Sequence, residues 1–114
     1  MNLVDSSGWI EYFVDSANAD KYANAIEDNE NLIVPTVCII EVFKKILRET
    51  NEDNALLALA KMKMGKIIEL DEQIAIDAAI YGIKYKLPLA DSIIYATGQK
   101  YNAPIYTQDE HFKD

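Results

Sequence analysis

Four short and largely apolar runs are spaced along this chain of 114 residues, and each is followed by an acidic or polar residue or by proline. The runs span residues 3–4, 32–34, 67–70 and 104–107. Segments with helical periodicity separate them, so each run is expected to be a strand that leads into a helical crossover. Strands and helices alternate in this way when a parallel sheet is covered by helices. We therefore predict an α/β fold, a three-layer α/β/α sandwich with a mainly parallel sheet of four to five short strands.

The chain is long enough to bury a core and is expected to form one domain over residues 1–114. Its formal net charge of −8 and its pI near 4.5 are not those of a protein that wraps DNA by bulk charge. Carboxylates that hold divalent cations are neutralised, however, so this balance does not exclude nucleic acid as a substrate. The single cysteine cannot form an internal disulfide. With no basic leader and no apolar run of membrane-spanning length, we expect a soluble, cytoplasmic protein with no membrane partner.

Asp91 lies near the start of a predicted helix over residues 87–101, just after Pro88, a residue typical of a helix start. Helical spacing puts Asp91 on the same side as Ile94 and Tyr95, on a face that we expect to be buried. A carboxylate removed from water needs a partner, and a metal ion is one candidate. The alternative is a solvated first-turn aspartate that is favoured by the helix dipole.

Three other acidic residues are predicted to lie at the same edge of the sheet as Asp91. Asp5 follows the first strand, Asp109 follows the fourth, and Glu41 lies about a turn and a half along the helix after the second strand. Ligands of parallel α/β sheets sit at the carboxyl ends of the strands, where these positions meet. The alternative for Asp5 is that it, Ser6 or Ser7 caps the following helix.

The helix predicted from Thr36, its expected N-cap, to about Glu49 has two distinct faces. Its predicted buried face consists of Ile39, Ile40, Val42, Phe43, Ile46 and Leu47. Glu41, Lys44, Lys45 and Arg48 cluster on the other side. The simpler interpretation of this polar side is a solvated face with a Glu41–Lys45 pair at i, i+4 spacing.

Four converging carboxylates would form an oxygen-only ligand set, which suits Mg²⁺ or Mn²⁺, and the chain lacks the Cys/His set of structural zinc sites. A pair of such ions makes hydroxide from water and stabilises the attacking and leaving oxygens of a phosphodiester. The predicted arrangement therefore favours metal-dependent hydrolysis of a nucleic-acid backbone.

Four segments of the chain, taken together and in order, resemble the PIN-domain ribonucleases, in particular the VapC-type toxins of prokaryotic toxin–antitoxin systems. The segments are LVDSSGWI from residue 3, VPT through IEV over residues 34–42, LPLADSIIYAT from residue 87 and IYTQDEHF from residue 105. The resemblance covers nearly the whole chain. Each motif alone is weak, but the four in this order are fairly specific.

The resemblance implies an endoribonuclease that binds Mg²⁺ or Mn²⁺ and is held inactive by an antitoxin protein. The acidic positions that would bind the metal and carry catalysis are Asp5, Glu41, Asp91 and Asp109. Ser6 and Thr107 match polar positions that support these ligands. The helical wheel, and not the resemblance, places Lys44, Lys45 and Arg48 where they could hold RNA phosphates.

The resemblance also implies a homodimer, to which Leu56, Leu59 and Met62 of the helix predicted over residues 55–64 could contribute. PIN domains usually continue beyond the motif around Asp109 into a final strand, whereas this sequence stops at Asp114. We therefore expect either a sheet without that edge strand or a truncated chain.

Two other classes of protein compete with this interpretation. One is a catalytically silent PIN fold that only binds a protein, although the presence of all four acids argues against it. The other is a receiver-like signalling domain, which needs paired acids after the first strand and a lysine after the last. Here Ser6 follows Asp5, and Thr107 ends the fourth strand.

Overall fold

A four-stranded sheet in the order β3-β2-β1-β4 forms the centre of the protein, and every pairing between its strands is parallel. The computed structural model describes residues 1–14 and 17–107. The strands are β1 (Asn2–Val4), β2 (Leu32–Pro35), β3 (Lys66–Ile68) and β4 (Ile105–Tyr106). In the register, Leu3 of β1 is aligned with Ile33 on one side and with Ile105 on the other. The predicted parallel α/β class is confirmed.

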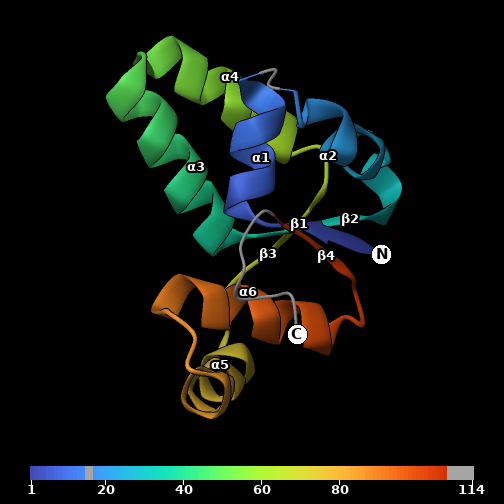
Figure 1. Ribbon diagram of the computed structural model, residues 1–114, viewed down its shortest axis with the longest axis vertical. Helices are drawn as coiled ribbons and strands as arrows, with labels where there is room; N and C mark the ends of the chain where they lie inside the picture. Colours follow the sequence, from blue (N-terminus) through green and yellow to red (C-terminus); the bar gives the residue numbers. More distant parts are fainter. Residues whose placement is uncertain (15–16, 108–114) are drawn as a thin grey trace.

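Helices cover both faces of this sheet, as Figure 1 shows. The helices are α1 (Ser6–Phe13), α2 (Ala19–Glu27), α3 (Thr36–Glu49), α4 (Glu52–Met62), α5 (Glu72–Tyr85) and α6 (Leu89–Lys100), with a 3₁₀ turn at Asn29–Asn31. The pairs α1–α2 and α3–α4 pack on one side, whereas α5 and α6 pack together on the other. The predicted three-layer sandwich is therefore observed.

The core lies between these layers, where the strands are buried almost completely. Leu3, Val4, Ile33 and Val34 have no exposed surface, and Trp9 of α1 is equally buried beside them. Strands covered on both faces are expected to be continuously apolar, as β2 and the buried Leu3 and Val4 of β1 are. No helix within residues 1–14 and 17–107 has the length and hydropathy needed to span a membrane.

Local capping explains where α5 begins but not where α3 begins. Asp71 accepts a hydrogen bond from the backbone N–H of Ile74 at 2.8 Å and caps α5, as its position in the sequence predicts. The prediction for Thr36 is wrong, because Pro35 occupies the cap position of α3 and Thr36 is already the first helical residue. Pro35 belongs to β2, so the strand leads directly into the helix without a polar cap.

The predicted buried face of α3 is only partly correct. Val42 is fully buried, but Ile40 is 64% exposed and Leu47 is 43% exposed. The helix packs on α1, α4, α6 and β2, and these contacts leave part of the apolar side of the helical wheel uncovered. Two large apolar side chains of α3 are consequently left at the surface. On α4, by contrast, Met62 of the suggested dimer surface is only 1% exposed, because it belongs to the core.

Candidate functional site

Asp5 lies at the carboxyl end of β1, a strand with neighbours on both sides, and is only 3% exposed. Its Oδ1 accepts hydrogen bonds from Ser7 Oγ at 2.7 Å and from the backbone N–H of Gly8 at 3.0 Å. Its Oδ2 accepts a hydrogen bond from Thr107 Oγ1. An ionised carboxylate is an acceptor of several hydrogen bonds, and these donors stabilise the negative charge of the buried group.

Asp5 is also the N-cap of α1, and the bond from Gly8 is the capping bond. Capping and a position in the acidic site are alternatives for Asp5 from the sequence alone, and in the structure Asp5 does both. Gly8 is needed here because a Cβ at this position would lie 2.7 Å from a methyl carbon of Val4 and 2.9 Å from the Tyr22 ring. This close approach lets the first turn of α1 begin directly above β1.

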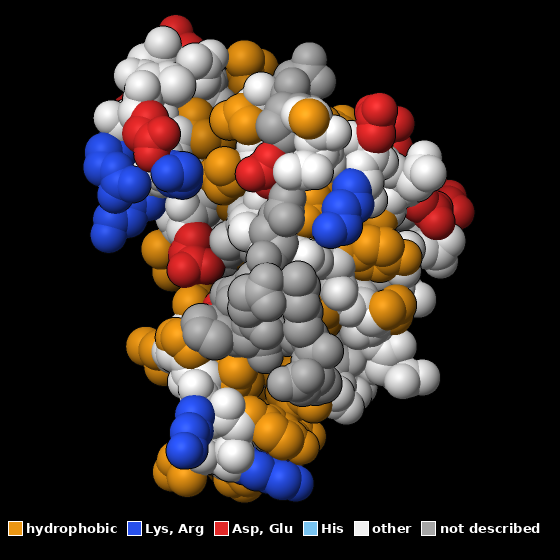
Figure 2. Space-filling view, in the orientation of Figure 1, with side chains coloured by type: hydrophobic (Ala, Val, Ile, Leu, Met, Phe, Trp, Pro, Cys, Tyr) orange, Lys and Arg blue, Asp and Glu red, His pale blue; other side chains and the backbone are white. Residues whose placement is uncertain are grey.

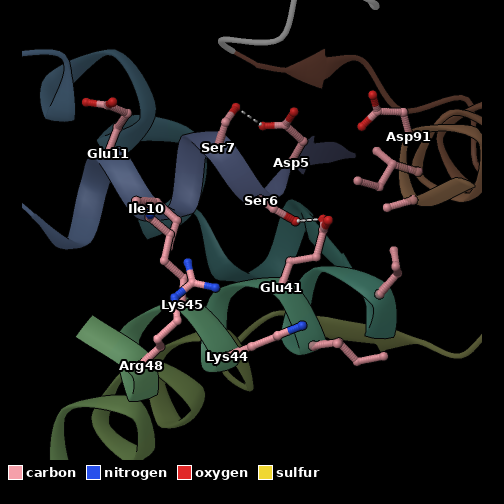
Figure 3. A pocket seen from close by; sticks show the side chains of 14 residues that line it. Asp5, Ser6, Ser7, Ile10, Glu11, Glu41, Lys44, Lys45, Arg48 and Asp91 are labelled. Carbon is pink, nitrogen blue, oxygen red and sulfur yellow. Dashed lines mark hydrogen bonds between the residues drawn. The ribbon is translucent and has the colours of Figure 1, made fainter. Parts of the chain in front are cut away.

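Glu41 and Asp91 reach the same region from two other helices. Glu41, on α3, accepts a hydrogen bond from Ser6 Oγ at 2.6 Å. Asp91, in the first turn of α6, is half-buried. Figure 3 shows Asp5, Glu41 and Asp91 around one cavity, with Ser7 directed at Asp5 and Ser6 directed at Glu41. Three elements that are distant in the sequence therefore bring three carboxylates together.

These three carboxylates line a pocket of about 700 Å³. Its other lining residues are Ser6, Ser7, Ile10, Glu11, Val37, Ile40, Lys44, Lys45, Arg48, Ala90 and Ile94. Acidic side chains occupy one part of it and the bases of α3 another, and Figure 2 shows basic side chains gathered over α3. The pocket thus combines groups suited to cations with groups suited to phosphates.

The negative charge of this pocket also reaches the core beneath it. Cys38 of α3 is fully buried, with its Sγ 4.0 Å from the carbonyl oxygen of Val4. Burial raises the pKa of the Cys38 thiol far above its ordinary range, and the charges of Asp5, Glu41 and Asp91 raise it further. The thiol is therefore a protonated core group and has no nucleophilic role.

The basic residues of α3 are positioned partly by an acidic neighbour. Lys45 Nζ lies 2.6 Å from Glu49 Oε2, and Arg48 Nη2 lies 3.5 Å from the same oxygen. These contacts replace the Glu41–Lys45 pair that is the simpler interpretation of the sequence. Glu41 turns to Ser6 instead, so its carboxylate belongs to the acidic part of the pocket.

Sequence reasoning placed most of these side chains but missed some. Ser6 and Thr107 lie beside carboxylates at the predicted positions. Ser7 was considered only as a helix cap, yet it donates to Asp5, and Glu11 was not singled out although it lines the pocket. Glu11 follows Asp5 by about 1.7 helical turns, so helical periodicity does not place the two side chains on one face and gives no signal for Glu11. Asp109 lies outside the described residues.

The donor set of the pocket suits a hard divalent cation, because all three acids offer oxygen ligands. Within residues 1–14 and 17–107, however, no three His, Cys, Asp or Glu side chains are close enough to form a ready-made metal site. Like charges repel when no cation lies between them, which favours separated carboxylates. The residue types fit a divalent cation, and the side chains stand around a common pocket.

Comparison with protein families gives a match to the PIN domain over residues 3–114. The chain belongs to the PIN-domain family. This match covers nearly the whole chain and agrees with the fold. Comparison with curated proteins gave no significant match.

Solved structures with the same fold include proteins of toxin–antitoxin systems. A toxin–antitoxin complex from Klebsiella pneumoniae contains a chain with a TM-score of 0.83 and 23% identity, covering 99% of this PIN domain and 91% of that chain. VapC20 of Mycobacterium tuberculosis, a toxin that cleaves the sarcin–ricin loop, has a TM-score of 0.80 and 13% identity over 96% and 90% of the chains. VapBC2 of Rickettsia felis, bound to promoter DNA, has a TM-score of 0.77 and 10% identity over 98% and 90%. At these identities, the similarity shows a shared fold.

Proposed function

We propose that this PIN domain is a Mg²⁺- or Mn²⁺-dependent endoribonuclease and the VapC-type toxin of a toxin–antitoxin pair. The observation that carries the proposal is the meeting of Asp5, Glu41 and Asp91 in one pocket that also contains the bases of α3. Carboxylates alone would repel an RNA backbone, and bases alone would bind it without chemistry. Their combination is what hydrolysis of a phosphodiester requires.

Each group has a separate part in this mechanism. Asp5, Glu41, Asp91 and, from the resemblance, Asp109 would hold the cation. When bound, the cation would activate water and stabilise the charge that develops on the phosphate. Ser6, Ser7 and Thr107 orient the carboxylates through their hydrogen bonds. Lys44, Lys45 and Arg48 would bind flanking phosphates and so fix the register of the RNA strand.

The proposed antitoxin would cover this pocket and the apolar surface next to it. Ile40, 64% exposed, lines the pocket, and Leu47 is exposed farther along the same helix. Exposed apolar side chains beside a functional pocket favour a protein partner. The Klebsiella pneumoniae chain of the same fold is from a toxin–antitoxin complex, which supports this assignment. We further propose that the protein acts in the cytoplasm and as a homodimer.

The decisive experiment is RNA cleavage by protein that has been separated from any partner. A panel of tRNA, rRNA fragments and mRNA should be cut with Mg²⁺ or Mn²⁺, and EDTA should stop the reaction. The variant Asp5→Asn should be inactive while it retains binding of RNA. Intact RNA across the whole panel, with metal binding confirmed separately, would favour the catalytically silent protein-binding module instead.

A further inference from the structure

Three tyrosines from α5 and α6 pack together into one aromatic cluster. The rings of Tyr81 and Tyr85, both on α5, are stacked, with their centroids 6.0 Å apart. The ring of Tyr95, on α6, stands at 84° to the first and at 67° to the second, with centroid distances of 4.9 and 5.5 Å. We call these three residues the tyrosine cluster.

The tyrosine cluster extends from the interior to the surface. Tyr81 is partly buried and packs against the hydrophobic core, whereas Tyr85, the last residue of α5, is 47% exposed. Packing of α5 on α6 accounts for the inner rings of the cluster. It does not account for a large exposed ring at the outer end. Because its neighbours hold this ring in place, a flat ligand can stack on it without first ordering a loose side chain.

The tyrosine cluster lies next to the acidic part of the pocket. Tyr95 follows Asp91 by four residues on α6, so the two side chains point within about 40° of each other and are about 6 Å apart along the helix axis. Figure 3 shows Asp91 on one side of the pocket and the bases of α3 on the other, with Asp5 and Glu41 between them. A strand held by the bases of α3 and crossing the carboxylates therefore reaches α6 and the tyrosine cluster next.

Positive charge surrounds the exposed ring of the cluster. Lys84 Nζ lies 5.2 Å from the centroid of the Tyr85 ring, and Lys86, also exposed, follows directly. Figure 2 shows basic side chains beside hydrophobic ones at the α5 end of the molecule. A nucleotide carries a flat base close to a phosphate, which matches a ring with lysines next to it. Lysine is depleted from protein–protein interfaces, so this surroundings favours nucleic acid over a protein partner.

We propose that the tyrosine cluster and Lys84 bind an unpaired base of the RNA and its adjoining phosphate beside the cleaved bond, with the base stacked on Tyr85. This inference rests on the nuclease function proposed above and adds the substrate class, RNA that is single-stranded next to the cut. Bases of a duplex are stacked on one another, whereas those of loops and ends can be splayed out onto aromatic side chains. Every base has a flat face, so the cluster selects unpaired RNA and not a particular sequence.

The test uses a single-stranded oligoribonucleotide that contains 2-aminopurine, a base whose fluorescence falls when it stacks. Binding is measured at low salt in EDTA, where no metal-dependent cleavage occurs. Wild type should bind and quench the probe. Tyr85→Ala should bind about 5- to 150-fold more weakly, the loss expected for one stacked base, and should not quench. Tyr85→Phe should restore both, because stacking uses the ring and not the hydroxyl.

The salt dependence of binding separates stacking from charge. Tyr85→Ala should leave the slope of log K against log salt unchanged, since no phosphate contact is lost. Lys84→Ala should reduce that slope by about 0.7, the value for one phosphate contact on a single strand. Tyr85→Ala that binds and quenches as wild type does would overturn the proposal.

Tyr101 provides a matched control at the other end of α6. Its ring also has lysines near it, with Lys66 Nζ and Lys100 Nζ 5.8 and 5.7 Å from its centroid. It follows Asp91 by ten residues, about 15 Å along the helix. Tyr101→Ala should therefore change neither affinity nor quenching, and circular dichroism should show all variants folded.

A duplex of the same sequence is the second control, because its bases are already paired and stacked. Tyr85→Ala should leave duplex binding unchanged, and an equal loss for duplex and single strand would overturn the assignment to an unpaired base. Cleavage after Mn²⁺ is added tests the nuclease separately. Quenching that depends on Tyr85 without cleavage would support the stacking site and overturn the nuclease. Cleavage without any dependence of binding on Tyr85 would do the reverse.

Discussion

Thr107, just after β4, donates a hydrogen bond to Asp5 at the end of β1, a residue 102 positions earlier in the sequence. The two strands are neighbours in the sheet, and the backbone N–H of Asp5 also donates to the carbonyl oxygen of Tyr106 at 3.1 Å. The last described strand thus holds the carboxylate that follows the first. The pairing of β4 with β1 therefore also brings Thr107 to the Asp5 carboxylate and orients it.

Thr107→Val should therefore lower the free energy of unfolding by about 1–3 kcal/mol, the cost of leaving a buried acceptor without its donor. Valine has nearly the same shape as threonine, so packing should be preserved. Urea denaturation measures the loss, and Thr107→Ser, which keeps the hydroxyl, should recover most of it. A Val variant as stable as wild type would show that this hydrogen bond does not support Asp5.

Mn²⁺ or Mg²⁺ should raise the melting temperature of the protein, because a ligand that binds only the folded state stabilises it by mass action. At about a hundred times the dissociation constant, the gain is about 2.7 kcal/mol. EDTA should reverse it, and Asp5→Asn should reduce it. An unchanged melting temperature across millimolar Mn²⁺ would count against a metal site.

Asp91→Asn should abolish cleavage and stabilise the metal-free protein. The substitution keeps the shape of the side chain and removes one of the negative charges that repel within the pocket. Binding of RNA should persist through the bases of α3, while the stabilisation by Mn²⁺ should shrink. Melting temperature with and without Mn²⁺, measured beside cleavage and RNA binding, tests all three expectations.

Asp53→Asn is the matched control, since Asp53 also lies in the first turn of a helix but on α4, away from the pocket. It should cost about 0.3–1 kcal/mol through the helix dipole and leave activity intact. If Asp91→Asn behaved in the same way as Asp53→Asn, Asp91 would be an ordinary first-turn aspartate and the proposed site would fail.

Arg48→Ala should weaken binding of RNA and lower its salt dependence, because each lost phosphate contact reduces the slope of log K against log salt by about 0.7 for a single strand. Glu49→Gln should strengthen binding, since Glu49 lies against both Lys45 and Arg48 and competes with phosphate. Fluorescence anisotropy at several salt concentrations measures both effects. Lys63→Ala, at the end of α4, should change neither the affinity nor the slope. Equal slopes for Arg48→Ala and wild type would remove Arg48 from the RNA surface.

Asp71 gives this domain a pH-dependent source of stability outside the pocket. The backbone N–H of Ile74 and then the Lys100 ammonium, 2.9 Å away, hold the pKa of Asp71 below its ordinary value of 3.8. A lowered folded-state pKa means that the stabilisation is complete above the unfolded pKa and is lost as the pH falls through the folded pKa. Asp71→Ala should therefore be less stable than wild type at neutral pH, and the difference should shrink in strong acid. A pH-independent difference in melting temperature would contradict this account.

Local sequence was sufficient for the class of fold and for the Asp71 cap, whereas it left Asp5, Ser6 and Ser7 as alternative caps of the first helix. Short apolar runs followed by acids or proline predict buried parallel strands, because burial on both faces demands continuous hydrophobicity. Asp5 and Asp71 stand three residues before the backbone N–H groups that they cap, and this spacing is a local property of the chain. The carboxyl-edge rule likewise predicts Asp5, Glu41 and Asp91 at one edge of the sheet, and all three line one pocket.

Tertiary structure alone decided which apolar and charged side chains of each helix meet a partner. A helical wheel gives the direction of Ile40 and Ile80 but not the width of the surface packed against each helix, and both are exposed. Lys45 has acidic neighbours both four residues before and four residues after it. Because Glu41 accepts a hydrogen bond from Ser6 of another helix, Lys45 forms its ion pair with Glu49. The bond from Thr107 to Asp5 depends on which strand lies beside β1. Such choices depend on contacts between distant segments, and periodicity along the chain carries no information about them.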